Sequence, residues 1–278
     1  MPLHQVDPHH PPALTDDEAA PPDALPRGDA LAEATAALSE RLGAAQALLT
    51  AEAKRAVLVV LQGRDTSGKD GTIRHVFSAC SPLGLRVVAF AAPSSQERAH
   101  DYLWRVHAAC PPRGAIGIFN RSHYEDVLAV RARGLAPEAV WSRRYRHIVE
   151  FERMLADEGT VVLKFFLHIS RAEQAERLRA RLDEPAKNWK FDAGDLDDRM
   201  RWDAYTAAYR DVLARTSTER APWYLVPADK KKARNYLVAE VIVRALEAMD
   251  PQPPTLPREH LEAHRAALDA QLEGERGA

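Results

Sequence analysis

The sequence predicts an α/β protein, a three-layer α/β/α sandwich in which a parallel sheet lies between helices. Five short and almost continuously apolar runs alternate with longer segments that have helical periodicity. Apolar runs of this kind are typical of parallel strands that are buried on both faces. The first run leads directly into a glycine-rich turn and then into a helical segment, so a strand, a tight turn and a helix follow in immediate succession.

The elements are expected in the following order. Residues 1–28 are rich in Pro, Asp and His, a composition that buries little apolar surface and predicts a flexible or draped arm. An Ala- and Leu-rich helix is expected at residues 30–55. Strands are expected at residues 57–61, 86–91, 115–119, 161–168 and 223–226. Helices between them are expected at residues 95–109, 137–158, 171–182, 196–217 and 230–249.

These boundaries divide the chain into three parts. The arm at residues 1–28 precedes a main domain at residues 29–250, and Pro-rich residues 251–254 open a C-terminal helical extension at residues 251–278. A chain of 278 residues is long enough for one large α/β domain with such extensions.

Composition excludes several classes of protein. The chain has 38 Lys and Arg against 40 Asp and Glu, so a polyanion can bind only where cations are concentrated locally. Cys80 and Cys110 lack metal-ligand spacing and are expected to be reduced thiols. No apolar stretch is long enough to span a membrane and no secretory signal is visible, so we expect a cytoplasmic protein.

The turn after the first strand carries the pattern GxxxxGK, from Gly63 to Lys69. Glycines at this spacing let the backbone wrap so that its N–H groups point at phosphate oxygens, and the following helix adds the positive end of its dipole. Lys69 adds a mobile positive charge. Asp70 stands where the motif usually has a Ser or Thr whose hydroxyl binds magnesium. Magnesium is therefore expected to be held without such a hydroxyl. The nucleotide- or phosphate-binding candidates here are Gly63, Thr66, Ser67, Gly68, Asp70 and Gly71.

The strand at residues 115–119 runs into a second polar segment, Asn120 to Asp126. Carboxylates at the end of a parallel strand suit a hard cation that keeps several waters, so Glu125 and Asp126 are candidates for handling magnesium. The alternative is a helix start whose acids favour the helix dipole. Arg121 is placed to reach a phosphate.

Four segments in this order resemble the polyphosphate kinase 2 family: LQGRDTSGKDGTI, HDYLWRVH, IGIFNRSHYEDVL and RLDEPAKNWKFDAGDLDDR. The resemblance covers roughly residues 30–249. It implies a P-loop kinase fold, a polyphosphate:nucleotide phosphotransferase activity and a homo-oligomer.

Residue by residue, the resemblance implies a catalytic or magnesium-linked role for Asp65, phosphate binding by Lys69 and charge neutralisation by Arg121. The family often reads Asp-Arg-Ser…Tyr-Asn-Arg, whereas this chain has Asn120 at the first of these positions. It is therefore similar to the branch that accepts both nucleoside mono- and diphosphates. In that branch Asp126 would be a metal-associated or catalytic acid and Glu125 would tune the acceptor site, while direct metal binding by Asn120 is less supported.

A chain of phosphates needs a string of cations rather than one pocket. Basic residues within 171–195 suggest a helical lid that closes over such a chain, and a second basic cluster begins the helix at 230–249. The alternative for both clusters is a solvated basic face. The candidate polyphosphate-binding residues are Arg177, Arg181, Lys187, Lys190, Lys230 and Lys231.

We therefore expect transfer of a phosphoryl group from inorganic polyphosphate to ADP and AMP with Mg²⁺, for which Mn²⁺ could substitute. Adenine and guanine nucleotides are the expected partners. Two alternatives remain at this point: an ATP-dependent nucleoside monophosphate kinase, and a non-catalytic module that binds nucleotides. A GTPase is disfavoured because no Asn-Lys-x-Asp segment occurs, and nucleic acid binding because no aromatic-interleaved basic sheet motif occurs.

Overall fold

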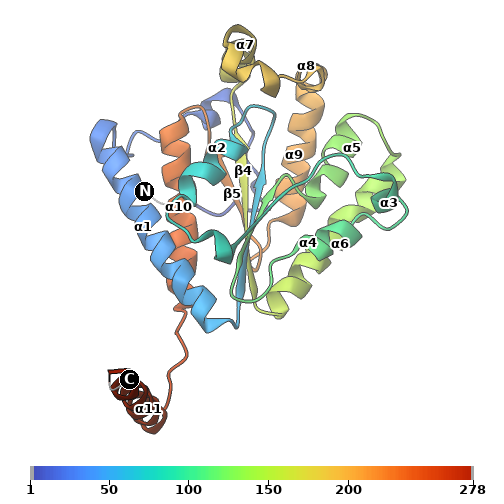
Figure 1. Ribbon diagram of the computed structural model, residues 1–278. Coiled ribbons are helices and arrows are strands. Elements are labelled where there is room, and N and C mark those ends of the chain that lie inside the picture. Colours follow the sequence, from blue (N-terminus) through green and yellow to red (C-terminus); the bar gives the residue numbers. More distant parts are fainter. Residues whose placement is uncertain (1–2, 277–278) are drawn as a thin grey trace.

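Five parallel strands form a single sheet in the order β2–β3–β1–β4–β5 (Figure 1). The structure is a computed structural model that describes residues 3–276. Helices cover both faces of the sheet, which confirms the predicted three-layer α/β/α sandwich (Figure 1). The strands are β1 (Ala56–Gln62), β2 (Leu85–Ala89), β3 (Ile116–Asn120), β4 (Thr160–His168) and β5 (Trp223–Pro227).

The helices fall into two layers and a cap. One face of the sheet is covered by α1 (Gly28–Glu52), α2 (Lys69–Val76) and α10 (Lys231–Met249). The other is covered by α4 (Trp104–Ala109), α6 (Glu138–Asp157) and α9 (Trp202–Thr216), with the short helices α3 (Ser95–Arg98) and α5 (Ala129–Ala132) beside them. The cap lies beyond the carboxyl ends of the strands and consists of α7 (Arg171–Asp183), a 3-10 helix (Pro185–Lys190) and α8 (Ala193–Met200).

Two predicted helices are broken in the structure. The segment 95–109 forms α3 and α4 with a turn between them, because the Asp101 carboxylate accepts a hydrogen bond from the Leu103 amide at 2.9 Å. Asp and Asn side chains make such turns in competition with helix. The segment 196–217 is broken at Arg201, and α8 begins earlier than predicted because Asp192 caps it by accepting from the Gly194 amide at 2.7 Å.

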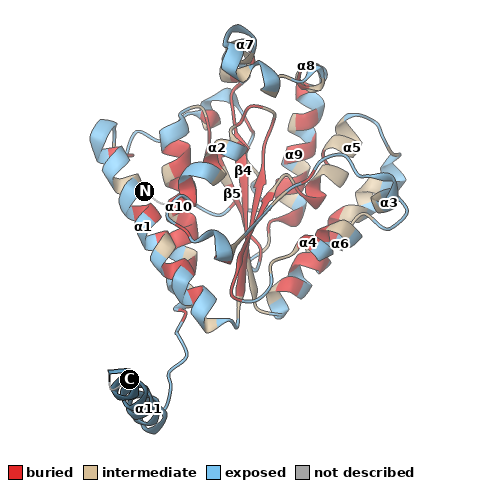
Figure 2. Cartoon of the chain, in the orientation of Figure 1, coloured by how far each residue is buried: buried red, intermediate tan, exposed pale blue. Residues whose placement is uncertain are grey.

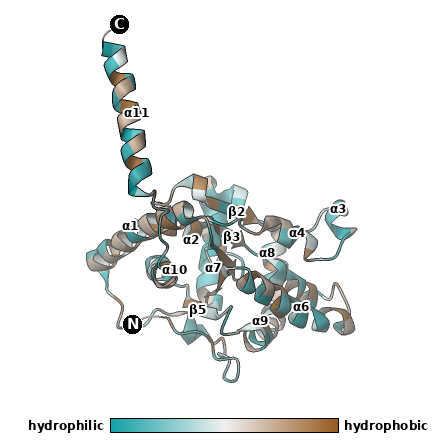
Figure 3. Cartoon of the chain, turned by 90° about the horizontal axis from the view of Figure 1, so that it is seen from below, coloured by the Kyte–Doolittle hydropathy of each residue, from teal (hydrophilic) through white to brown (hydrophobic). Residues whose placement is uncertain are grey.

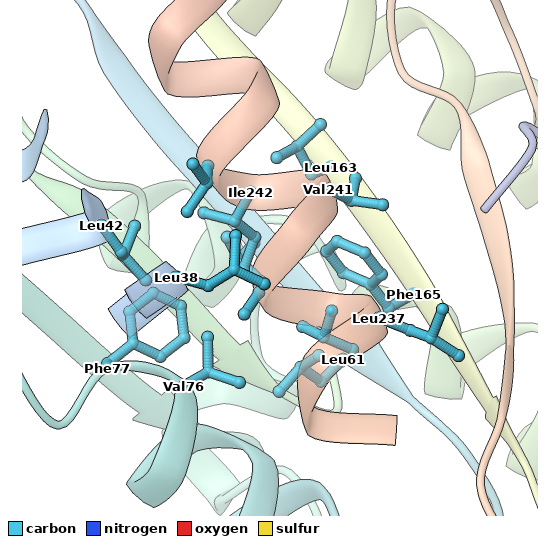
Figure 4. Close-up of a cluster of buried hydrophobic side chains, with 14 of the residues drawn as sticks. Leu38, Leu42, Leu61, Val76, Phe77, Leu163, Phe165, Leu237, Val241 and Ile242 are labelled. Carbon is cyan, nitrogen blue, oxygen red and sulfur yellow. The ribbon is translucent and has the colours of Figure 1, made fainter. Parts of the chain in front are cut away.

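The alternation of side chains along β1 divides the core into two clusters. Val57, Val59 and Leu61 pack toward α1 and α10, whereas Leu58 and Val60 pack toward α6 and α9. Figure 4 shows the first cluster, in which side chains of α1, α2 and α10 meet those of β1 and β4. Strands β1, β3, β4 and β5 are largely buried and the outer faces of the helices are exposed (Figure 2), whereas the edge strand β2 is partly exposed, unlike the fully covered strand that its apolar run predicted.

The described part of the N-terminal arm is draped over the domain. The Val6 amide donates to the Trp223 carbonyl at 2.8 Å, and His168 Nε2 lies 2.7 Å from the Thr15 carbonyl oxygen. The arm also buries apolar side chains, including those of Leu14 and Leu25. Composition alone left a flexible or a draped arm open, and these contacts correspond to the draped one.

Helix α11 (Arg258–Arg276) projects away from the sandwich (Figures 1 and 3). None of its residues is buried, and its exposed leucines include Leu261, Leu268 and Leu272. It lies in the predicted C-terminal extension and is helical, as expected from the sequence. Within residues 3–276, no helix is both long enough and apolar enough to cross a membrane.

Candidate functional site

The carboxyl ends of β1 and β3 bring the two predicted motifs together. These strands are neighbours in the sheet, with Leu61 opposite Asn120. The glycine-rich loop therefore leaves β1 directly beside the segment 121–126 that leaves β3. Ligands bind in this crevice in open parallel sheets.

The shape of the loop depends on its glycines. Gly68 has a φ of 99° and lies against the Arg234 guanidinium so closely that a Cβ would collide with it. A Cβ on Gly63 would lie 2.6 Å from Ser67 Oγ. Thr66 has a φ of 65°, a conformation that is uncommon for a residue with a side chain and is found mostly at functional sites.

Lys69 folds back over this loop from the first turn of α2. Its Nζ donates to the carbonyl oxygens of Gly63 at 2.8 Å and Arg64 at 3.3 Å. Burial, and after it the positive charge of Arg121, lower the pKa of Lys69 to about 8. The ammonium group is therefore held where a phosphate would relieve its unfavourable environment.

An ion pair between Asp65 and Arg121 joins the loop to the second motif. Burial raises the pKa of Asp65, but Arg121 and Lys69 lower it more, so that it lies below the ordinary value. Burial lowers the pKa of Arg121, but Asp65 and Glu125 raise it more, so that it lies above the ordinary value. Arg121 itself has a φ of 62°, and its amide donates to the Leu61 carbonyl at 3.0 Å.

A first cavity of about 250 Å³ opens between this ion pair and α5, α8 and α9. Five predicted site residues line it: Gly63, Asp65, Arg121, Glu125 and Asp126. Much of the remaining wall is apolar or aromatic, from Phe90, Ala129, Val130, Leu135, Tyr205 and Tyr209. Arg133 pairs with both carboxylate oxygens of Asp198 at 2.5 and 2.8 Å and closes one side.

Separate partners hold the two acids of the second motif. Arg144 Nη1 donates to Asp126 Oδ1 at 3.0 Å, and burial raises the pKa of Asp126 even though Arg144 lowers it. Gln62 Nε2 donates to Glu125 Oε1 at 2.9 Å. Gln62 is the last residue of β1 and has no exposed surface.

The two positions that depart from the usual motifs contact each other. Asn120 Nδ2 donates to Asp70 Oδ1 at 2.7 Å. An Asp at position 120 would face the Asp70 carboxylate with a like charge, whereas Asn offers a donor. The neutral residue at the end of β3 and the acidic residue after Lys69 are therefore explained together.

A second and larger cavity of about 580 Å³ lies between the loop, α2 and the cap. It is strongly cationic, since nine Lys or Arg side chains but only four Asp side chains line it. The cations are Lys69, Arg74, Arg121, Arg177, Arg181, Lys187, Lys190, Lys231 and Arg234. Five more predicted residues line it: Thr66, Gly68, Asp70, Gly71 and Asn120. The two cavities share Asp65, Arg121, Phe90 and Ala91.

The predicted lid cations have unequal surroundings. Arg177 donates to the Thr66 and Ser67 carbonyl oxygens at 2.9 and 3.3 Å, so it holds the loop as well as lining the cavity. Arg181 Nη1 donates to Asp195 Oδ2 at 2.7 Å, and burial raises the pKa of Asp195 to about 6. Lys187 is half-exposed, and its Nζ lies 2.5 Å from Glu184 Oε2.

Two predicted residues line neither cavity. Ser67 is completely buried beneath the loop, and its hydroxyl has no hydrogen-bond partner within residues 3–276. Lys230 is the residue before α10, and its side chain is exposed. Lys231, in the first turn of that helix, lines the second cavity.

Sequence reasoning missed the contribution of α9 to the site. The Arg64 guanidinium lies 3.8 Å from the centre of the Trp202 ring and donates to Thr206 Oγ1 at 2.5 Å. Tyr205 and Tyr209 are four residues apart on the same helix and line the first cavity. That aromatic spacing was the only available signal in the sequence. Further lining residues that were not predicted are Arg64, Arg74, Arg105, Arg133, Gln174, Asp195 and Asp198.

Comparison with known proteins gives one consistent result. The model of the family described as Polyphosphate kinase 2 matches residues 27–254. The chain belongs to the polyphosphate kinase 2 family. It is 58% identical over 226 residues to the AMP/ADP-polyphosphate phosphotransferase of Meiothermus ruber, covering 80% of this chain and 85% of that protein. It is 47% identical to the ADP-polyphosphate phosphotransferase of Rhodopseudomonas palustris, covering 76% and 77% of the two chains.

A solved polyphosphate kinase 2 has the same fold. The crystal structure of the enzyme from Arthrobacter aurescens matches with a TM-score of 0.89 and 38% identity over 96% of each chain. All residues of this polyphosphate kinase 2 chain that line the two cavities fall inside the matched residues 27–254. Most of the arm and all of α11 lie outside them.

Proposed function

We propose that this protein transfers a phosphoryl group from inorganic polyphosphate to adenine nucleotides, converting ADP to ATP and AMP to ADP. The main support is that two cavities with different linings meet at Asp65 and Arg121. The first cavity is small and has an aromatic wall, which suits a nucleoside. The second is larger and lined by many cations, which suits a chain of negative charges.

The reaction asks the protein mainly for alignment and charge neutralisation. A phosphate oxygen of the nucleotide in the first cavity forms a bond to the terminal phosphorus of polyphosphate. The bond from that phosphorus to the bridging oxygen breaks, and the shortened chain leaves with the electron pair. Lys69 and Arg121 are placed to neutralise the group that is transferred. The attacking oxygen is already anionic, so a strong general base is not required.

Asp65 and Asp126 would hold Mg²⁺, because their carboxylates line the same cavity. No group of three or more His, Cys, Asp or Glu side chains among residues 3–276 forms a closed metal site. Proteins commonly bind Mg²⁺ through one or two carboxylates together with substrate phosphates. When bound, the ion supplies positive charge to the phosphates; Mn²⁺ is proposed as a substitute.

The acceptor range rests on the second motif. Asn120, Glu125 and Asp126 resemble the branch that accepts mono- and diphosphates, and the 58% identical relative is named an AMP/ADP-polyphosphate phosphotransferase. We therefore include AMP among the acceptors, propose that guanine nucleotides are accepted as well, and propose a homo-oligomer.

The test is to incubate AMP, ADP and ATP separately with polyphosphate and Mg²⁺ and to separate the products by chromatography. We expect ATP from ADP and ADP from AMP, and no product when polyphosphate is omitted. AMP phosphorylation that requires ATP as the donor would identify an ordinary monophosphate kinase instead. Binding of nucleotide without any turnover would identify a non-catalytic module, and failure with AMP alone would remove the monophosphate from the proposal.

A further inference from the structure

Gln62 is a buried polar residue that the proposed mechanism does not use. It ends β1 on the face of the sheet that carries Leu58 and Val60, the face toward α6 and α9. Its side chain has no exposed surface and lines neither cavity, so it cannot touch a substrate. Glu125, its hydrogen-bond partner, does line the first cavity.

The bond to Gln62 is the only side-chain hydrogen bond of the Glu125 carboxylate within residues 3–276. The negative charge of Glu125 acts on two nearby cations, Lys69 and Arg121, although it pairs with neither. Without an anchor, this carboxylate would be free to turn toward them. Arg121 would then be drawn toward Glu125 and away from Asp65.

The backbone next to Glu125 is fixed separately. The preceding residue, Tyr124, is completely buried, donates to Glu152 Oε1 at 2.7 Å and accepts from Lys164 Nζ at 2.9 Å. Lys164 and Glu152 form a buried ion pair at 2.5 Å. Rotation of the Glu125 side chain is thus the remaining freedom, and the Gln62 amide restricts it. The other amide atom, Gln62 Oε1, is buried without a partner in the described chain, so Glu125 alone orients this amide.

We propose that Gln62 is a positioning residue, which holds the Glu125 carboxylate against the wall of the first cavity and keeps it from competing with phosphate for Lys69 and Arg121. The inference rests on the proposed function in one respect: the first cavity must hold the nucleotide acceptor. It predicts that Gln62 acts on the nucleotide only through Glu125.

A double-mutant cycle tests this with four proteins: the wild type, Gln62→Met, Glu125→Ala and the double variant. Met has a similar size but cannot donate. In the wild-type background we expect Gln62→Met to lower kcat/KM for ADP roughly tenfold, the size expected when a hydrogen bond to a charged group is lost. In the Glu125→Ala background the same change should alter kcat/KM less than about twofold, since the group to be positioned is absent.

A second readout separates positioning from a general structural effect. Any rise in the KM for polyphosphate in Gln62→Met should disappear in the Glu125→Ala background, because Lys69 and Arg121 line the second cavity and the competing carboxylate is then absent. The matched control is Gln46→Met. Gln46 is also buried and bonds both Ser81 backbone groups at 2.8 and 2.9 Å, but it lines neither cavity. We expect this control to lose stability and to keep its kinetic constants.

ADP affinity, measured by calorimetry on the same four proteins, makes the inference testable without turnover. Equal effects of Gln62→Met on ADP affinity in both backgrounds, or a rise in the KM for polyphosphate that persists in the Glu125→Ala background, would overturn it. A wild type that binds ADP but does not use polyphosphate would instead contradict the proposed function. If Gln62→Met does not fold, Gln62→Asn replaces it in the cycle, because it keeps the amide but is too short to reach Glu125.

Discussion

At the scale of the residue, the site is organised around charges that are only partly compensated. Asp65 and Arg121 pair at the point where the two cavities meet, and Lys69 is held by backbone carbonyls rather than by an acid. Perturbed titratable groups in a cleft of this kind are typical of functional sites. The individual side chains therefore lead to two predictions.

Asp65→Asn should lower turnover with ADP and polyphosphate at least about a hundredfold, a loss of the size seen when a group that acts in the transition state is removed. Unfolding in denaturant should change far less, because Arg121 stays partly exposed and solvated without its partner. The matched control is Asp211→Asn, which removes the Arg131 pair at 2.5 Å and lines neither cavity. Equal losses of turnover in both variants would contradict a catalytic role for Asp65.

Polyphosphate affinity should fall above pH 8. The pKa of Lys69 is about 8, so the ammonium is charged below this pH and loses its charge above it. A bound polyanion stabilises the charged form, so binding above pH 8 must take up a proton, and affinity can fall by up to about tenfold per pH unit. Polyphosphate dissociation constants between pH 7 and 9.5, without acceptor, measure this. Lys69→Met should remove that decline; an unchanged decline would show that another group titrates.

At the scale of the element, the strands and the cap contribute different parts of the site. Strands β1 and β3 are buried and align the two motifs, whereas α7 and the following 3-10 helix supply cations from above the sheet (Figure 1). Two of the four arginines of α7 lie on the side that faces the second cavity. Arg177 and Arg181 line the second cavity, but Arg179 is exposed and does not.

Arg181→Ala should therefore raise the KM for polyphosphate about tenfold, a loss in the range measured for one charge-assisted hydrogen bond. The KM for ADP should stay within about twofold, because Arg181 does not line the first cavity. Arg179→Ala is the matched control, with the same substitution on the same helix, and should leave both constants unchanged. Equal effects of the two variants on polyphosphate would mean that the lid contributes only general positive charge.

At the scale of the whole molecule, α11 contributes no side chain to the hydrophobic core of the sandwich. Two hydrophobic clusters, one on each face of the sheet, hold the sandwich together, and neither contains a residue of α11. The net charge of the chain is −2, yet the second cavity is strongly cationic. Attraction of a polyanion is thus a local property of the cavity rather than a property of the whole surface.

Ending the chain after Pro254 should leave the unfolding temperature within about 2 °C and turnover unchanged, because burial dominates stability and α11 buries nothing. Thermal unfolding and the ADP reaction measure this. Light scattering of the chain with and without the residues after Pro254 tests in addition whether α11 contributes to a homo-oligomer. A large loss of thermal stability in a chain that loses its oligomeric state would show that α11 packs against a second copy.

The sequence by itself determined the fold class and the two motifs, because the period of apolar residues and the spacing of glycines and Lys69 are local properties of the chain. The motifs gave Gly63, Arg121, Glu125 and Asp126, the resemblance to the family gave Asp65, and all five line one cavity. The break between α3 and α4 escaped prediction, because an Asx turn at Asp101 overrode helical propensity.

Only the tertiary structure decided which residues from distant parts of the chain meet. Gln62 reaches Glu125 because β1 and β3 are neighbours in the sheet. Arg64 lies on Trp202 because α9 packs beneath the loop. Such contacts depend on strand order and helix packing, which have no short-range signal in the sequence. The same reason explains why Asn120 and Asp70, two separate departures from the usual motifs, became one hydrogen bond only in the fold.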